Sequence, residues 1–447
     1  MSYKQILLAL FLCATLVHWP TDVFAEKDKF LSIFSGSFYD RFRLRTTGGE
    51  SDIDNETQFT LNIGDAAEQK VTGHLQAGVL VDLNGVQGNS FDGIYDSFSS
   101  SAVGRLYYAY LNINKTVPFD TVRIGRQHNY DFESFYFDGA FFELIPFYGF
   151  KLSGYAGKPV HLYENQFGWE GDDFLVGSAL TWTPVERVRL RFDVAHLRDN
   201  AAAFRVTQGD QEDSLLGATV WLDPLKNWDV YGRFTSFGDQ TRDLSFATSL
   251  KFPNEDLRVK ASVYRILQPY DVRVPELDIY GIAGTYQKYT DLMLDVTKGL
   301  GEHFSTSGGF SWRLLDTAQT ASAFNHGYKR GYLTVSTNDL PIKGLNLSAT
   351  GDYYHGEDSI LNDNYFGGSF YASKGFLKKK LVATAGTAYY LYRFNFATGN
   401  ESQDVQTIYA KLEAKVLKTL KFKADYEWEH NSLNVFHTFN LALIRDF

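Results

Sequence analysis

Apolar and polar residues alternate along most of the chain from about Phe30 onward, in runs of about ten residues that end in turn-forming clusters. The segment 345–354 shows the pattern most clearly. Its odd positions carry Leu345, Leu347, Ala349, Gly351 and Tyr353, and its even positions carry Asn346, Ser348, Thr350, Asp352 and Tyr354. Because successive side chains of a strand point to opposite faces, this run predicts a β-strand with one apolar and one polar face.

The same alternation recurs at regular intervals. It is found in the segments 71–82, 187–194, 257–264, 420–429 and, near the N-terminus, 41–45. A soluble antiparallel sheet with one solvated face would also alternate in this way. Three observations favour a membrane barrel instead: the pattern runs almost the whole length, no helical segment is available to cover the apolar face, and the apolar positions often end in Tyr, Trp or Phe, as an interfacial girdle requires.

The alternation therefore predicts an all-β fold, a single antiparallel transmembrane β-barrel of about 22 strands, in the range 18–22, with no plug domain. Two segments leave the strand number open. Residues 130–150 are irregular, and residues 276–298 could form one long strand or two strands and a turn. A barrel of about 22 strands has a backbone diameter of roughly 45 Å.

The N-terminus has the pattern of a secretory signal peptide. Lys4 precedes an apolar run at 6–17, and Ala25 ends a Val-Phe-Ala cleavage motif, which predicts a signal peptide at 1–25 and a barrel at 26–447. The apolar run is too short for a membrane helix, which needs about 20 residues. Cys13, the single cysteine, lies in this segment, and no C-x-x-C-H motif exists, so we expect no cofactor in this chain; if haem chemistry is involved, a partner chain brings the haem.

Two classes of connection alternate along the chain. Short ones often contain proline, as at Pro184, Pro224, Pro253 and Pro341. Longer, acidic and glycine-rich ones are expected at 47–56, 84–101, 158–171, 199–213 and 316–327. Because outer-membrane barrels have short periplasmic turns and longer external loops, the alternation predicts that both termini lie in the periplasm.

The chain ends on an alternating strand, 435–447, whose last residue is Phe447. A terminal phenylalanine on such a strand resembles the sorting signal of bacterial outer-membrane barrels. Arg445 and His437 depart from the apolar pattern, and snorkelling at the strand ends would accommodate them. The resemblance implies a Gram-negative outer membrane as the location, with outer-membrane lipid and the barrel assembly machinery as partners and no nucleic-acid partner.

The polar face is rich in charges of both signs. Near the predicted periplasmic turns it is mainly basic, with Arg187, Arg189, Arg258, Lys260, Lys411, Lys415, Lys421 and Lys423, whereas the predicted external loops carry Glu50, Asp52, Asp54, Glu56, Glu357, Asp358 and Asp363. These charges would keep a lumen and its loops hydrated. Alternatively, they form a gradient or docking surface for a charged solute or partner.

Residues 121–127 (TVRIGRQ), followed by 137–140 (FDGA), resemble a signature of bacterial porins. The resemblance implies that Arg123, Arg126 and Gln127 face the pore, beside an inward segment at 127–138; an ordinary hairpin is the alternative. Together with the basic residues of the polar face, the candidate pore-lining residues are Arg41, Arg43, Arg45, Arg123, Arg126, Gln127, Arg187, Arg189, Arg191, Arg258, Lys260, Lys421 and Lys423.

Two further segments, 106–110 (LYYAY) and 338–345 (NDLPIKGL), resemble porin-like barrels of metal-reducing deltaproteobacteria. Some members of that group are sheaths that house a multihaem c-type cytochrome. The resemblance therefore implies a conduit for electron transfer, in which a cytochrome would fill a wide lumen that has no plug.

We expect a non-enzymatic, porin-like channel, either general or substrate-selective, with the conduit sheath as the alternative. No H-x-x-x-H, G-x-S-x-G or P-loop motif is present, so neither a metal site nor catalytic residues are predicted. A barrel enzyme would require a lumenal Ser or Asp with a His base, an arrangement that the sequence does not reveal.

Overall fold

The computed structural model describes residues 33–65, 67–84, 91, 101–129, 135–160, 173–199, 211–238, 240–268, 270–271, 285–286, 288–316, 327–357, 364–395, 400–431 and 434–447. The predicted signal peptide and most of the predicted connections at 84–101, 158–171, 199–213 and 316–327 lie outside these ranges, as do Asp358 and Asp363.

The described chain is almost entirely β-structure. Its first strands are β1 (Phe34–Thr47), β2 (Glu50–Ile63), β3 (Val71–Asp82), β4 (Ala102–Thr116), β5 (Phe119–Asn129), β6 (Phe135–Leu144), β7 (Phe150–Pro159), β8 (Phe174–Val185), β9 (Val188–Asp199), β10 (Gln211–Leu225), β11 (Trp228–Phe237) and β12 (Gln240–Phe252). After the 3-10 turn η4 (Pro253–Glu255) follow β13 (Leu257–Ile266), β14 (Tyr270–Asp271), β15 (Thr285–Tyr286), β16 (Tyr289–Leu300), β17 (Phe304–Leu315), β18 (Tyr328–Asn338), β19 (Leu345–Gly356), β20 (Asn364–Phe376), β21 (Leu381–Asn395), β22 (Asn400–Lys415), β23 (Leu420–His430) and β24 (Val435–Asp446).

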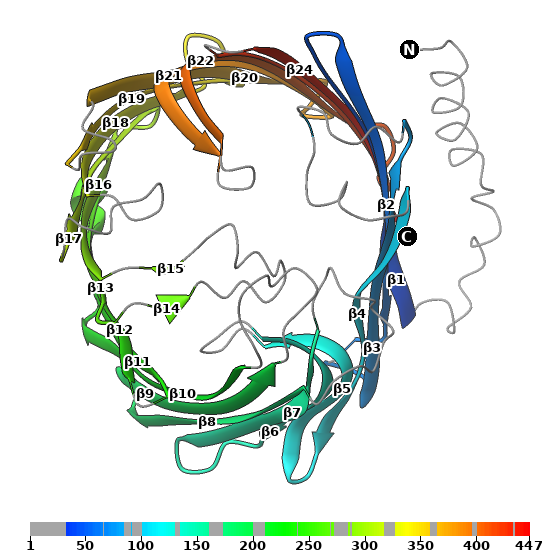
Figure 1. Ribbon diagram of the computed structural model, residues 1–447, viewed down its shortest axis with the longest axis vertical. Coiled ribbons are helices and arrows are strands. Elements are labelled where there is room, and N and C mark those ends of the chain that lie inside the picture. The colour runs from blue at the N-terminus through cyan, green and yellow to red at the C-terminus, as the bar shows by residue number, and fades with distance from the viewer. Residues whose placement is uncertain are drawn as a thin grey trace.

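All of these strands except β14 and β15 form one closed antiparallel barrel. Consecutive strands pair with each other, and β1 pairs with β24, which joins the first and last strands of a 22-stranded sheet (Figure 1). The prediction of an all-β barrel of about 22 strands is confirmed. The open question at 276–298 is also answered, because β16 is the barrel strand of this segment, whereas β15 pairs only with β14.

The two faces of the wall differ as the alternation predicted. Large apolar side chains on one face are open to the surroundings, with exposed fractions of 58% for Leu333, 54% for Ile408 and 62% for Phe366. On the other face the neighbouring residues pair across strands, as in the ion pair of Arg330 with Asp352. We assign the apolar face to the outside and the paired, polar face to the lumen. No helix among the described residues is long and apolar enough to cross a membrane.

Aromatic side chains mark both ends of the outer face. Near the end that carries the termini lie Trp182, Phe252, Phe304 and Phe376, and near the opposite end lie Trp312, Tyr353, Phe366 and Trp428. Two such belts, separated by aliphatic residues, are typical of barrels that span a bilayer.

The connections differ between the two ends of the barrel. At the end with the chain termini they contain two to seven residues, as in β8–β9 and β2–β3, whereas at the other end they contain two to 22, the longest joining β13 to β16. The prediction of one end with short turns is thus confirmed. The expected long connection at 47–56 is wrong, because β1 ends at Thr47 and β2 begins at Glu50.

The segment 47–56 is a tight hairpin because Gly48 and Gly49 form its two-residue turn, with φ angles of +50° and +98°. Glycine adopts positive φ angles without steric strain, and two-residue turns of this kind match the twist of the strands. Glu50, Asp52, Asp54 and Glu56 therefore lie on β2 and not in an external loop. Their acidity suggested a loop, whereas their alternation with Ser51, Ile53 and Asn55 was the strand signal.

The terminal residue Phe447 helps to close the barrel. Its backbone exchanges two hydrogen bonds with Gly36 of β1, at 3.1 and 3.0 Å, and its ring stacks on Phe59 with centroids 6.0 Å apart. A Cβ atom at Gly36 would lie 2.6 Å from the Phe447 ring, so only glycine allows this approach. The last residue thus has a structural role in the seam, whatever its role in sorting.

Candidate functional site: the charged inner wall of the barrel

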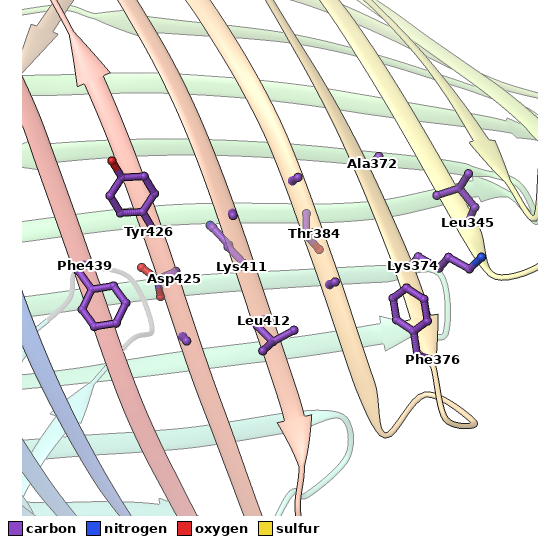
Figure 2. Close-up of a pocket in the computed structure, with 14 residues that line it drawn as sticks. Leu345, Ala372, Lys374, Phe376, Thr384, Lys411, Leu412, Asp425, Tyr426 and Phe439 are labelled. Carbon is purple, nitrogen blue, oxygen red and sulfur yellow. The ribbon is translucent and has the colours of Figure 1, made fainter. Parts of the chain in front are cut away.

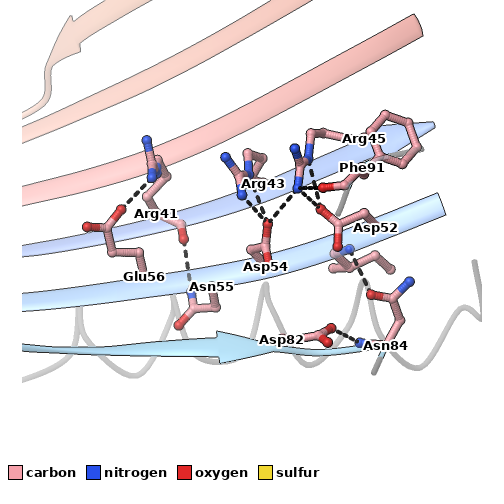
Figure 3. Close-up of polar contacts among 11 residues, drawn as sticks. Arg41, Arg43, Arg45, Asp52, Asp54, Asn55, Glu56, Asp82, Asn84 and Phe91 are labelled. Atoms are coloured by element: carbon pink, nitrogen blue, oxygen red, sulfur yellow. Dashed lines mark hydrogen bonds and ion pairs between the residues drawn. The ribbon is translucent and has the colours of Figure 1, made fainter. Parts of the chain in front are cut away.

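The inner face at the seam carries three arginine–carboxylate pairs, which we call the β1–β2 ladder (Figure 3). Register sets Arg41 opposite Glu56, Arg43 opposite Asp54 and Arg45 opposite Asp52, so each arginine contacts its direct cross-strand neighbour. The ladder follows from sequence, since R-x-R-x-R and D-x-D-x-E both place every charge on one face of a strand.

The pairs of the ladder are short and partly buried. Arg43 donates from Nε and one Nη to the same Oδ of Asp54, at 2.9 and 2.5 Å, and Arg45 Nε donates to Asp52 at 2.8 Å. Arg41 pairs with Glu56. The Asp52 and Asp54 side chains are only 3% and 8% exposed, against 21–24% for their arginines. Such charges are tolerated because each carboxylate is neutralised by its neighbour.

Asp82 of β3 adds a further carboxylate beside Asp52 and Asp54, at the end of the ladder away from the chain termini. One oxygen from each of Asp52, Asp54 and Asp82 lies within 4.8 Å of the others. Three carboxylates at such spacing can hold a hard cation. Here the arginines already supply the positive charge, because Arg45 approaches both Asp52 and Asp54. The cluster is therefore described by ion pairs, without a metal.

Phe91 closes the ladder from above. Arg45 donates to its carbonyl oxygen at 3.1 Å and lies 5.2 Å from the centre of its ring, in cation–π contact. The ring also packs edge-on against Phe436 of β24 at 5.8 Å, and Phe91 is 7% exposed. Arg45 and Phe436 both project inward. Phe91, which belongs to the connection between β3 and β4, contacts both and therefore lies inside the lumen.

The candidate residues of the porin-like signature divide into two groups. Arg123 lies on the inner face, where it donates to Asn112 at 2.8 Å and covers the ring of Tyr110 at 4.5 Å. Arg126 forms two bonds with Asp138, at 2.8 and 2.7 Å, and Gln127 is 1% exposed, donating to the Gly139 carbonyl. These two residues hold β5 to β6, which suits a structural role; residues 130–134 lie outside the described chain.

The remaining candidates also lie next to specific partners. Three of them form ion pairs: Arg191 with Asp193, Lys421 with Asp446 and Lys423 with Glu413. Arg189 covers the Trp221 ring at 4.0 Å, and Arg258 donates a hydrogen bond to Ser249. Lys260 lies opposite Asp295 in the strand register, and Arg187 lies in the β8–β9 turn. Their role in lining a pore stays a prediction. Among these described candidates, Arg191, Lys421 and Lys423 have acidic partners, whereas Arg189 and Arg258 contact an aromatic ring or a hydroxyl group and keep their positive charge uncompensated by these contacts.

A second inner region, on β17–β21, has few charges. The half of this region nearer the short-turn end is lined by hydroxyl side chains that bond across strands: Thr334 with Thr350, Ser336 with Ser348 and Thr384 with Ser373, each at 2.9 Å. We call these three pairs the hydroxyl wall. Above it, Arg330 pairs with Asp352, and Tyr332 donates to Asp295.

The sequence did not indicate the apolar cluster on the inner face of β6–β10. Phe135, Phe137, Tyr155, Leu175, Ala195, Leu197 and Leu215 form it, each 7% exposed or less. The odd positions of β9 show why it was missed, because Arg189, Arg191 and Asp193 precede Ala195 and Leu197 on the same face. A change from polar to apolar within one face was the available signal.

No family model and no curated protein matches the chain. The fold resembles solved bacterial outer-membrane proteins at very low identity. The P pilus usher PapC translocation pore has a TM-score of 0.50 at 9% identity over 92% of this chain and 99% of that one. A BenF-like porin from Pseudomonas fluorescens Pf-5 has a TM-score of 0.47 at 11% identity, covering 94% and 99%, and Pseudomonas aeruginosa OccK11 (OpdR) 0.42 at 10%, covering 93% and 95%. At these identities the comparisons establish the barrel fold alone.

Proposed function

We propose that the chain is a channel of a Gram-negative outer membrane that lets small hydrophilic solutes pass through its lumen, without a catalytic step. The observation that carries the proposal is the division of the wall into an apolar outer face and a charged inner face around a closed ring of 22 strands. A bilayer admits a sheet only when every strand edge is paired, as the β1–β24 seam provides.

The orientation follows from the unequal ends. Both termini lie at the end with the shorter connections, and short turns face the periplasm in outer-membrane barrels. We therefore place both termini in the periplasm. The basic positions Arg189, Arg258 and Lys260 then lie near the periplasmic mouth, where they would favour anionic over cationic solutes.

The chain's own side chains narrow the lumen, and this favours a channel over a sheath. Phe91 covers the ladder, and the apolar cluster on β6–β10 is buried although only one chain is present. A barrel built around a cytochrome would need its inner face free for a second protein. The conduit sheath is still the second candidate because a barrel of about 22 strands is wide enough to need a plug, and the described residues form no separate plug domain.

Planar-bilayer recording of the purified, processed barrel tests the channel. We expect stepwise ion conductance with a modest preference for anions. The double substitution Arg258→Glu and Lys260→Glu should lower this preference for anions. Absence of conductance in the folded barrel, together with copurification of a haem protein from the native membrane, would favour the sheath instead.

A further inference from the structure

The outer face of β19–β24 contains a shallow apolar groove, which we call the alanine groove. Its floor consists of the small side chains Ala372, Ala383, Ala385, Ala410 and Ala424, and its volume is about 460 Å³. Larger side chains border it, with Tyr426 and Phe439 at one end and Leu345 and Phe376 at the other (Figure 2). The strand pairing places the five alanines on the same outward face as these larger residues.

The groove has a direction and a length. It starts on β20 close to the short-turn end and crosses the strands to Phe439 on β24, four strands away, which is about 19 Å at the usual interstrand spacing. Because the strands of such barrels are tilted by about 40°, this path runs obliquely and rises by about 12 Å along the bilayer normal. One leaflet of a bilayer contributes about 15 Å of hydrocarbon. The groove therefore offers room for an acyl chain that enters from the interface at the short-turn end.

A lysine lies where the groove meets that interface. Lys374 lines the groove on the outward face of β20, next to Phe376, over whose ring its Nζ lies at 5.5 Å. The long methylene stem of lysine can follow the apolar wall while the ammonium group reaches the aqueous side. At this depth it would meet the headgroup of a lipid whose chain fills the groove.

The turns directly below the groove are also basic. The β18–β19, β20–β21 and β22–β23 turns carry the exposed residues Lys343, Lys378, Lys379, Lys380 and Lys418. Their single acidic residue, Asp339, accepts a hydrogen bond from the Gly344 backbone within its own turn. We call these five lysines and Lys374 the lysine rim. Such clusters next to a membrane bind anionic headgroups.

We propose that the alanine groove and the lysine rim form a binding site for one anionic phospholipid of the leaflet at the short-turn end. The groove takes an acyl chain, and the rim holds the phosphate headgroup. A second copy of this chain fits less well, because symmetric copies would bring identical lysine rims together. The inference needs the outer wall to face lipid, as the proposed function does, but it is independent of what passes through the lumen.

Native mass spectrometry of the purified full-length barrel in non-ionic detergent tests the site, with dioleoylphosphatidylglycerol and dioleoylphosphatidylcholine as probes. We expect one phosphatidylglycerol to be retained in preference to phosphatidylcholine. The triple substitution Lys374→Gln, Lys378→Gln and Lys379→Gln should weaken the binding of phosphatidylglycerol roughly tenfold or more and leave that of phosphatidylcholine nearly unchanged. The exposed Lys226, on the β10–β11 turn of the same end, provides the matched control in Lys226→Gln.

A groove-filling variant tests the apolar half. Ala385→Phe should reduce retention of both lipids, whereas Ala349→Phe, on the outward face of β19 outside the groove, should not. Heat-modifiable mobility in electrophoresis would confirm that each variant is folded. Equal retention of the two lipids by wild type, or a dimer that Ala385→Phe abolishes, would overturn the proposal. Because lipid retention is read separately from conductance, failure of this site leaves the channel proposal standing.

Discussion

The β1–β2 ladder and the hydroxyl wall are two solutions to the same problem, a polar inner face on a barrel whose outer face is apolar. In the ladder, three arginines meet three carboxylates in direct register, and the carboxylates are nearly buried. In the hydroxyl wall, Ser and Thr side chains satisfy one another across strands without any charge. The ladder depends on both partners of each pair, whereas each hydroxyl pair tolerates the loss of one member.

Charge reversal within the ladder should have the largest effect. Arg43→Glu would remove the main partner of Asp54, which keeps only the more distant Arg45 at 3.7 Å, and would place a second negative charge beside it. Removal of one partner of a buried pair costs about 3–5 kcal/mol. Because Arg43 is 24% exposed, we expect a loss of about 3 kcal/mol in the free energy of unfolding. Urea unfolding in lipid vesicles, followed by tryptophan fluorescence, measures it.

Two controls sharpen this prediction. Thr350→Glu in the hydroxyl wall introduces the same charge two residues from Asp352, a carboxylate that keeps its own partner Arg330, and we expect a loss below about 1 kcal/mol. The double variant Arg43→Gln and Asp54→Asn should recover most of the stability of wild type, since a neutral pair leaves no uncompensated charge. Equal losses for Arg43→Glu and Thr350→Glu would show that the ladder has no special dependence on charge pairing.

A charge on the outer face should cost a similar amount of stability. Leu333 lies in the middle of β18, is 58% exposed and points toward the acyl chains, so Leu333→Arg should lower the free energy of unfolding by about 2–4 kcal/mol. Its neighbour Thr334 belongs to the hydroxyl wall, and Thr334→Arg should assemble almost normally. The same vesicle unfolding assay compares them; identical stabilities would mean that the two faces have been assigned wrongly.

Loss of a single hydroxyl should have the smallest effect. Ser336→Ala removes one member of the bond with Ser348, and a neutral hydrogen bond contributes about 0.5–1.5 kcal/mol. Because the remaining Ser348 is only 6% exposed, lumenal water reaches it poorly, and we expect about 1 kcal/mol. A loss as large as that of Arg43→Glu would erase the distinction between the two regions.

The sequence predicted the barrel well because its signal is local. Alternation at 345–354 identified β19 and its outward residues, and Phe447 marked the closing strand. The prediction failed for residues whose position depends on a cross-strand partner. The acidic residues of β2 resemble a polar loop when they are taken alone, and only the register across the two-residue turn shows that Arg41, Arg43 and Arg45 neutralise them.

The inner apolar cluster and the position of Phe91 were missed for a related reason. Both depend on contacts between segments far apart in the chain, such as Phe91 with Phe436 and Phe137 with Leu175. Alternation shows that a residue is on the inner face but not what covers it. The floor of the alanine groove is likewise formed by four strands, β20 to β23, each of which contributes only one or two alanines.

Single-cysteine labelling tests the central assignment of faces most directly, because the chain contains only Cys13, within the predicted signal peptide. Thr334→Cys and Leu333→Cys differ by one position on β18. In the barrel reconstituted into lipid vesicles, a charged, membrane-impermeant maleimide should react readily with Cys at 334, which would face lumenal water, and very slowly with Cys at 333, which would face lipid. Faster reaction at 333 than at 334, or equal rates at both, would contradict a barrel with an apolar outer wall and a water-filled lumen.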